Sequence, residues 1–514
     1  MRFHIVHLLL FFVGIGGAEC AHSPVGELGK PEIGAMAPLL VTDPRKPGWQ
    51  EDKQSWKRFK KELLQLKAMG FRAITVDVWW GIVQQNSPAR FDWSYYDMVF
   101  SQIRDAGFFI VPILSVHACG TNVNDDSSVP LPSWILKLVP TLAAGRDAAY
   151  VSEAGNRSEE VISVWATEYI LPYYRRFWEA FHDHFGNLSG SMPQLIVGVG
   201  PAGELVYPSY HHHDRSKNYG PTQYPNRGAL QASSTLAQES LRLWLQSKYH
   251  SIDQLNRAWS TEFSNFLSVR LLALSVEVEK FFANHLQYSP MGQDFFDWYR
   301  DSLFHHGYVM GLAFSKIYQR EGSPFRGARL AMKVPGIHWQ FENRMAQLTS
   351  GLLSTRGASL DSSLSAFQRQ PNDWNHDEGY GYRELFRQVF RKLRRAEPRV
   401  DWVGIFNCGE LENEERFSRG YDLVTAIGKL ASQYEMPFVL ENALADSLFS
   451  QSAFDVLYSH LKNYPFFLGV TLLRQMQAVR SPLVKAFATN LPTKEFPSSC
   501  ARLLLNANRN SNQR

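Results

Sequence analysis

Eight short hydrophobic runs, separated by segments of helical periodicity, constrain the fold of this chain more than any other feature. The runs are rich in β-branched and aromatic side chains and lack the polar alternation of a half-exposed strand. This composition is typical of parallel strands that are buried on both faces. The runs are residues 37–41, 73–80, 108–114, 195–199, 328–333, 402–406, 437–440 and 466–471.

Amphipathic helices are predicted between these runs. A first helix carries Trp56, Phe59 and Leu66 on one face and ends at Gly70, and a second ends at Gly107. Later helices are predicted at residues 165–185, 382–395 and 423–434. Eight such units predict an α/β fold, a closed (β/α)8 TIM barrel with long insertions in its βα loops. A doubly wound open sheet is the alternative, but no glycine-rich phosphate loop follows the first run.

The two ends of the chain differ in composition from the rest. Arg2 and His4 precede the apolar residues 8–15, and small residues follow, so residues 1–20 are predicted to be a secretory signal peptide. An uncleaved anchor is the alternative, although the apolar run is short for a bilayer. The barrel is expected over residues 35–490, and residues 491–514 are expected to be a poorly structured tail. We therefore expect a protein of the secretory pathway or the extracellular space.

Charge and cysteine content exclude several classes of function. A formal net charge of +4 is small for 514 residues and does not indicate nucleic acid or an acidic membrane surface as a partner. The basic run at 391–395 fits the solvated face of a helix. Three cysteines beyond the signal lie far apart and form no CxxC pair, which predicts free thiols without a disulfide framework. Two glycosylation sequons begin at Asn156 and Asn187.

Polar side chains follow the predicted strands at their carboxyl ends, where barrels collect their chemistry. Glu204 is the most informative, because Leu205, Tyr207 and Pro208 would partly desolvate its carboxyl group. Desolvation raises the pKa of a carboxyl group and suits it to act as a general acid. A helix cap or a solvated turn residue is the alternative. The other residues at strand ends are Asp77, His117, Lys333, Asn407, Glu441 and Arg474.

Residues 198–210 resemble the second signature of the β-amylases, the exo-acting starch hydrolases of glycoside hydrolase family 14. The resemblance implies that Glu204 is the general acid, although Val206 stands where plant members carry arginine. Residues 440–444 are similar to the segment that holds the general base of the family. Glu441 would be that base, with Leu440 in place of the usual glycine.

Further residues match the family at sugar-binding positions. Residues 117–125 resemble the first signature, in which His117 would bind glucose and Asp125 would lie on a closing loop. The inner loop matches less well, since Asn407 replaces threonine and Gly409 replaces leucine. The substrate-binding residues that the resemblance implies are Asp77, His117, Asp125, Lys333, His338, Asn407, Glu410, Asn442, Ala443 and Arg474.

The resemblance implies hydrolysis of α-1,4-glucosidic bonds in starch, with β-maltose released from non-reducing ends. Glu204 would protonate the glycosidic oxygen while Glu441 activates a water, which requires carboxyl groups about 6.5–9.5 Å apart and inverts the anomeric carbon. No cofactor or metal is expected, and the tract at 211–214 is interpreted as a loop and not as a metal site. The expected partner of this monomer is an α-1,4-glucan.

Two alternatives remain open. The altered inner loop is compatible with a catalytically silent glucan-binding barrel, although both Glu204 and Glu441 are present. Residues 251–259 are similar to barrel β-galactosidases, which would predict a retaining enzyme with its carboxylates closer together.

Overall fold

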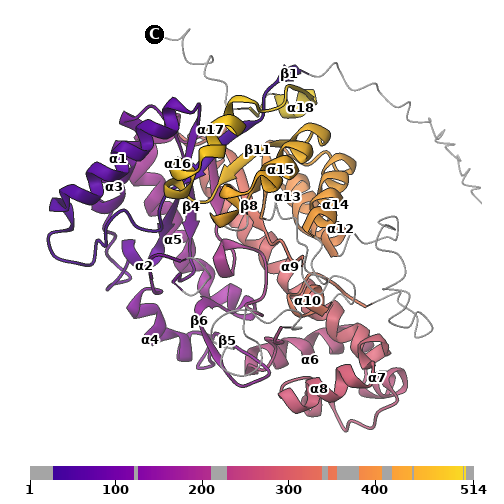
Figure 1. Ribbon diagram of the computed structural model, residues 1–514. Helices are drawn as coiled ribbons and strands as arrows, with labels where there is room; N and C mark the ends of the chain where they lie inside the picture. The colour runs from indigo at the N-terminus through magenta and orange to yellow at the C-terminus, as the bar shows by residue number, and fades with distance from the viewer. Residues whose placement is uncertain are drawn as a thin grey trace, which may run out of the picture.

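Eight parallel strands close into a barrel in this computed structural model, which describes residues 27–120, 125–209, 228–338, 345–355, 381–407, 420–442, 445–501 and 503–504 (Figure 1). The predicted TIM barrel is therefore confirmed. Around the ring the strands are β2 (Glu32–Met36), β3 (Ala73–Trp79), β4 (Phe109–Ser115), β7 (Gln194–Val197), β8 (Arg329–Val334), β9 (Trp402–Phe406), β10 (Phe438–Glu441) and β11 (Phe467–Leu472).

The strands are buried along nearly their whole length, as the hydrophobic runs predict. β3 and β4 share seven aligned pairs, from Ala73 with Phe109 to Trp79 with Ser115, and β11 pairs with β2 to close the ring. All residues of β8, β9, β10 and β11 are buried. Because every strand is parallel, all the carboxyl ends meet at one mouth of the barrel.

The first strand is not where the sequence analysis placed it. Residues 37–41 were expected to form it, but β2 spans Glu32–Met36. Pro38 has no backbone N–H for a ladder, and the side chains that follow it are buried by packing alone. The strand that forms contains Glu32 and Gly34 and so lacks the continuous hydrophobic run of the other strands. The carboxylate of Glu32 is buried by an ion pair in which the Nη2 of Arg329 lies 3.2 Å from Oε2.

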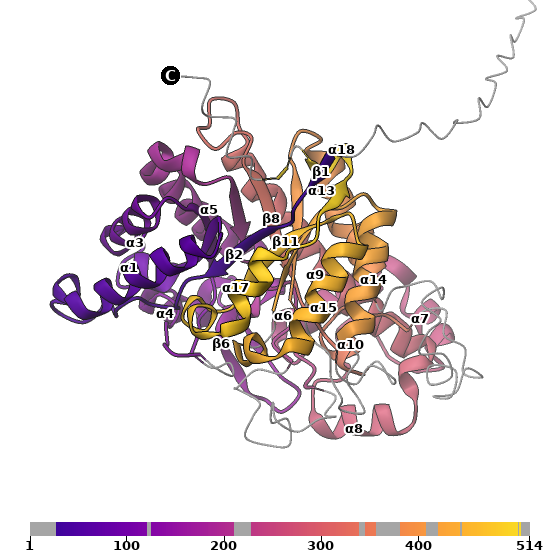
Figure 2. The same cartoon turned by 45° about the horizontal axis from the view of Figure 1, so that its top comes forward.

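Helices form an outer layer around the strands (Figures 1 and 2). α1 (Lys53–Ala68) and α3 (Ser94–Asp105) end near Gly70 and Gly107, whose φ angles of 91° and 79° stop each helix as predicted. The other long helices of this layer are α5 (Thr167–Phe185), α14 (Gly420–Gln433) and α15 (Gln451–Asn463).

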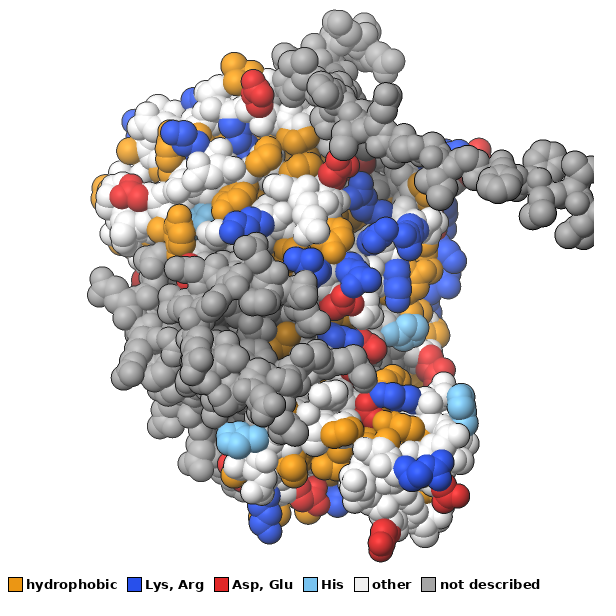
Figure 3. All heavy atoms as spheres, turned by 90° about the vertical axis from the view of Figure 1, so that its right-hand side faces the viewer, with side chains coloured by type: hydrophobic (Ala, Val, Ile, Leu, Met, Phe, Trp, Pro, Cys, Tyr) orange, Lys and Arg blue, Asp and Glu red, His pale blue; other side chains and the backbone are white. Residues whose placement is uncertain are grey.

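The predicted helix at 382–395 consists of three consecutive pieces. These are α12 (Tyr382–Leu385), the π-helical turn η9 (Phe386–Phe390) and α13 (Arg391–Ala396). In α13 only Leu393 is buried, and the arginines and the lysine around it are exposed. Figure 3 shows a face of the molecule on which Lys and Arg side chains gather. The interpretation of this run as a solvated helix face is confirmed.

A helical insertion lies between β7 and β8, and its helices α6, α7 and α8 are at the lower right of Figure 1. It contains α6 (Thr235–Tyr249), α7 (Ile252–Trp259), α8 (Ser275–Ala283) and the long helix α9 (Pro290–Tyr318). Buried Asp294 on α9 accepts hydrogen bonds from Trp259 Nε1, at 3.0 Å, and from the Tyr249 hydroxyl, and it pairs with Lys248. Asp294 therefore fastens α6 and α7 to α9.

The start of the C-terminal tail differs from the prediction. Within residues 491–514, β12 (Lys494–Phe496) pairs antiparallel with β1 (Glu27–Gly29), and α18 (Ser498–Ala501) follows. Arg329 also donates from Nη1 to the carbonyl of Leu503 at 2.7 Å. Polar composition hid this segment because its few buried side chains, such as Phe496, are spaced too widely to form a run. Residues 505–514 and 1–26 lie outside the described residues.

Lys494 in β12 gives a testable pH dependence of stability. Its Nζ donates to the carbonyls of Tyr464 and Phe467 at 2.8 and 2.6 Å, and burial lowers the pKa of Lys494 to about 7, although Cys500 acts in the opposite direction. Between pH 7 and the ordinary pKa of 10.5, the unfolded chain holds a proton that the folded chain lacks. Folding stability therefore gains up to about 1.4 kcal/mol per pH unit in this window from Lys494.

A Lys494→Met variant should lack this gain. Urea unfolding of wild type and variant at pH 7.5 and pH 9 is expected to show that wild-type stability rises relative to the variant as the pH increases. Lys485→Met, at an exposed position, serves as the control and should follow the wild type. Parallel pH profiles for the wild type and Lys494→Met would contradict a depressed pKa.

Candidate active site

Glu204 lies in a tight turn after β7, which we call the acid loop (residues 198–205). The turn requires glycine at position 200, because a Cβ there would lie 2.3 Å from the carbonyl oxygen of Glu204, and at position 203, where φ is +78°. Beyond the turn, Glu204 forms a parallel bridge with Lys333, and the amide of Leu205 donates to the Lys333 carbonyl at 3.1 Å. The acid loop therefore fixes Glu204 beside the end of β8.

Glu441 ends β10 and is 1% exposed. Its Oε2 lies 2.9 Å from the Nζ of Lys333, whose side chain is also buried. Burial alone would lower the pKa of Lys333, but the carboxylates of Glu441, Glu204 and Asp77 outweigh this effect and raise it. Lys333 is consequently a cation among three carboxyl groups, which joins the ends of four strands in one electrostatic cluster.

Asp77 lies near the end of β3 and belongs to the same cluster. Its Oδ1 accepts a hydrogen bond from the hydroxyl of Ser115 at 2.9 Å. Burial raises the pKa of Asp77, while the cations of Arg474 and Lys333 act in the opposite direction. Ser115 was not recognised in the sequence analysis, although it directly follows the run at 108–114 and so lies at a strand end.

His117 lies at the same mouth. Its ring meets that of Trp79 edge to face, with centroids 5.2 Å apart. A Cβ built on Gly203 would lie 3.4 Å from both His117 Cε1 and Lys333 Cδ, so all three residues are neighbours. Asp125 accepts a hydrogen bond from the amide of Gly120 at 2.8 Å. Residues 121–124, between them, lie outside the described residues.

Two asparagines of the predicted sugar-binding set contact protein groups. Asn407 donates from Nδ2 to Oε1 of Glu204 at 3.2 Å. Asn442 is fully buried, donates to the carbonyl of Leu473 at 3.1 Å and accepts from its amide at 2.6 Å. Asn442 thus holds the backbone directly before Arg474.

The remaining predicted residues are less well connected to the two carboxyl groups. His338 is buried, and burial lowers its pKa to about 3, so its imidazole is neutral at physiological pH. Arg474 lies 3.5 Å from the carbonyl of Ala37 and lines a cavity of about 110 Å³ with Asp126 and Arg58. Glu410 and Ala443 lie outside the described residues, as does the tract at 211–214. No cluster of three or more metal-ligating side chains occurs in the described part of the chain.

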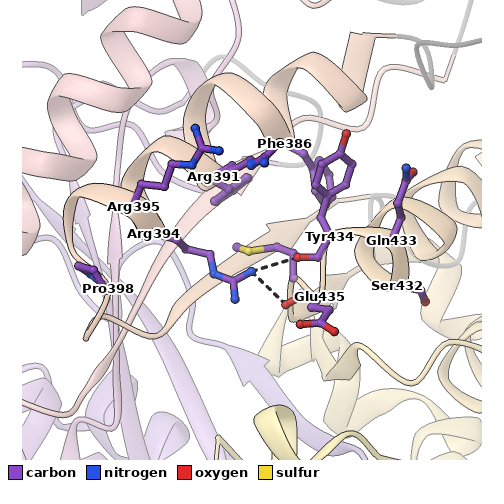
Figure 4. A pocket seen from close by; sticks show the side chains of 11 residues that line it. Phe386, Arg391, Arg394, Arg395, Pro398, Ser432, Gln433, Tyr434 and Glu435 are labelled. Carbon is purple, nitrogen blue, oxygen red and sulfur yellow. Dashed lines mark hydrogen bonds between the residues drawn. The ribbon is translucent and has the colours of Figure 1, made fainter. Parts of the chain in front are cut away.

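A separate groove of about 740 Å³ lies between α13 and the end of α14 (Figure 4). Its lining residues directly precede β9 and β10, so it is at the opposite end of the barrel from Glu204 and Glu441. Arg394 donates there to the carbonyls of Tyr434 and Glu435 at 3.0 and 3.3 Å. The arginine therefore binds the carbonyls of the two residues directly after α14, and the groove takes no part in the carboxylate cluster.

The segment that resembled a β-galactosidase has a structural role. Asn256 accepts from the Thr261 hydroxyl and the Phe263 amide, which closes the chain after α7, and Trp259 reaches Asp294. These contacts stabilise the insertion. This structural role accounts for the segment without galactosidase chemistry.

Comparisons with known proteins point to one family. The family model described as glycosyl hydrolase family 14 matches residues 50–371. The chain is 33% identical over 429 residues to a thermophilic β-amylase of Thermoanaerobacterium thermosulfurigenes, covering 82% of this chain and 68% of that protein. It is 34% identical over 289 residues to a β-amylase of Cytobacillus firmus, covering 56% of this chain and 58% of that one. The match to a β/α-amylase of Paenibacillus polymyxa spans 23% of that protein.

Solved structures agree with these matches. The crystal structure of the catalytic domain of a β-amylase from Paenibacillus polymyxa superposes with a TM-score of 0.70 at 26% identity, covering 89% of this chain and 96% of that one. A β-galactosidase from Marinomonas ef1 gives a TM-score of 0.51 at 12% identity, over 89% of this chain and 58% of that chain, which is a likeness of fold alone.

Proposed function

Because the chain belongs to glycosyl hydrolase family 14, we propose that it cleaves α-1,4-glucosidic bonds of starch-like glucans from their non-reducing ends and releases β-maltose. The observation that carries this proposal is the position of Lys333. Its backbone pairs with Glu204 and its ammonium contacts Glu441, so one residue connects both carboxyl groups at the mouth of the barrel. Glycoside hydrolysis requires two carboxyl groups that face the scissile bond, and the contacts with Lys333 support such a pair.

Glu204 would act as the general acid. The side-chain amide of Asn407 donates to Oε1 of Glu204. An oxygen that already accepts a hydrogen bond is less readily protonated than the other oxygen of the same carboxyl group. The transferable proton is then carried on Oε2. From there it would pass to the glycosidic oxygen as the bond to the anomeric carbon breaks.

Glu441 would act as the general base. Its Oε2 is held 2.9 Å from the ammonium of Lys333, and a carboxylate is the form of the group that accepts a proton from water. The activated water would attack the anomeric carbon from the face opposite to the leaving oxygen and invert its configuration. Asp77, His117, His338 and Arg474 would bind sugar hydroxyl groups around this water and the scissile bond.

The anomeric form of the first product tests this proposal. We expect proton NMR of the purified protein with maltopentaose to show β-maltose first, followed by slow mutarotation to the α form. α-Maltose as the first product would contradict inversion. Release of galactose from a galactoside with starch untouched would support the galactosidase alternative, and glucan binding without cleavage would support a silent barrel.

We propose further that residues 1–20 direct the chain into the secretory pathway. Asn187, exposed in the turn η3 (Gly186–Ser191), is then the more accessible of the two sequons, since Asn156 is half-buried between β5 (Ala149–Val151) and β6 (Arg157–Ile162). No helix in the described ranges has the length and apolar content to cross a membrane.

A further inference from the structure

Three residues on one face of helix α9 pack against the acid loop and the chain directly after it. The carbonyl of Tyr299 accepts from the hydroxyl of Tyr207 at 2.8 Å, and the two rings stack with centroids 4.0 Å apart. His306 lies 2.8 Å from the carbonyl of Val199 through Nε2. At the next residue, a Cβ on Gly307 would lie 2.5 Å from Leu205 Cδ2, so the helix backbone packs directly against the loop.

The hydrogen bonds of His306 define its tautomer. Burial lowers its pKa to about 4, so the ring is neutral and carries one N–H at physiological pH. The Val199 carbonyl can only accept, which places the hydrogen on Nε2. Nδ1 is then an acceptor and faces the hydroxyl of Thr167 at 2.6 Å, and the one hydrogen of this hydroxyl is shared between Nδ1 and the Val164 carbonyl, 2.5 Å from the same oxygen. His306 therefore ties the start of α5 to the acid loop.

Val199 connects His306 to the backbone next to Glu204. Its amide donates to the carbonyl of Gly203 at 3.3 Å, so Val199 is fixed on one side by His306 and on the other by the residue before Glu204. The amide of Glu204 itself donates to Pro201 at 2.9 Å within the same turn. A displaced Val199 would therefore displace the backbone that carries the acid.

We propose that His306 is a positioning residue for the Glu204 carboxyl group, acting through the Val199 carbonyl and the backbone of the acid loop. The inference rests on the proposed function, because it assigns a role within that reaction. Misplacement of a catalytic group by about 1 Å can cost about 10²-fold in rate. Loss of the His306 contact should consequently impair protonation of the leaving group more than it impairs substrate binding.

A comparison of two leaving groups tests the proposal. Maltopentaose needs protonation of a sugar oxygen, whereas fluoride leaves α-maltosyl fluoride with much less help from an acid. In His306→Leu we expect kcat on maltopentaose to fall about 10²-fold with KM nearly unchanged, while kcat on α-maltosyl fluoride falls less than about tenfold. His306→Gln, whose amide can donate to Val199 and accept from Thr167, should recover most of the loss.

His460→Gln is the matched control, because His460 is a buried histidine on α15, outside the acid loop, whose Nδ1 donates to the Val456 carbonyl 2.9 Å away. It should leave both activities within about twofold of wild type, because its contacts, which include the ring of Tyr421, lie on α14 and α15 and not on the acid loop. Equal losses of His306→Leu on the two substrates, or no rescue by His306→Gln, would overturn the positioning role while the proposed function stands. A folded wild-type protein that cleaves neither substrate would overturn both.

Discussion

Glu204→Gln is expected to reduce kcat on maltopentaose by about 10³-fold, within the range of 10²–10⁴ that general acid catalysis typically contributes. Glutamine has the shape of glutamate, and its Oε1 can still accept from the Asn407 amide, so KM and folding should change little. The variant lacks only the transferable proton. Initial rates of maltose release, measured by a reducing-sugar assay, check this expectation.

The same variant should keep most of its activity on α-maltosyl fluoride, because fluoride departs without a full proton transfer. Glu262→Gln, which alters an exposed glutamate in the helical insertion, is the control and should match the wild type on both substrates. Undiminished turnover of maltopentaose by Glu204→Gln would remove Glu204 as the acid. A similar loss on both substrates would indicate a role in binding or folding instead.

The sequence predicted the strands where burial alone determines the pattern. Seven of the eight hydrophobic runs coincide with barrel strands, because a parallel strand buried on both faces needs nothing but apolar residues. The position of β2 was not predicted, because its buried Glu32 is neutralised by Arg329, nearly three hundred residues later in the chain. A tertiary ion pair of this kind has no local signal, and the same is true of the pairing between β1 and β12.

The site was predictable to the extent that strand ends determine it. Asp77, Lys333 and Glu441 carry polar groups at the ends of three strands, and the closed ring brings them together. The contacts that hold these groups in place were not predictable. His306 lies in the middle of α9, where a histidine among aromatic residues gives no sign that its ring reaches the Val199 carbonyl. Ion pairing of Lys333 with the expected base was missed for the same reason, since it depends on the distance between strands.

Glu441→Gln is expected to reduce kcat on maltopentaose and on α-maltosyl fluoride by about 10³-fold or more. Both reactions need an activated water, whatever the leaving group is. This outcome distinguishes the base from the acid, whose replacement should spare α-maltosyl fluoride. A retained rate on maltopentaose would exclude Glu441 from the reaction. Rates on the two substrates, measured side by side for both variants, check the assignment.

Glu441→Gln should also destabilise the fold, because it removes the carboxylate that lies 2.9 Å from the buried ammonium of Lys333. Breaking a buried ion pair costs about 3–5 kcal/mol, and the negative charge of Asp77 near Lys333 should reduce this cost. The double variant Lys333→Met/Glu441→Gln removes the unpaired cation and should regain stability in urea unfolding without regaining activity. If the double variant recovered turnover, the loss in Glu441→Gln would reflect the stranded lysine, and a different group would have to deprotonate the water.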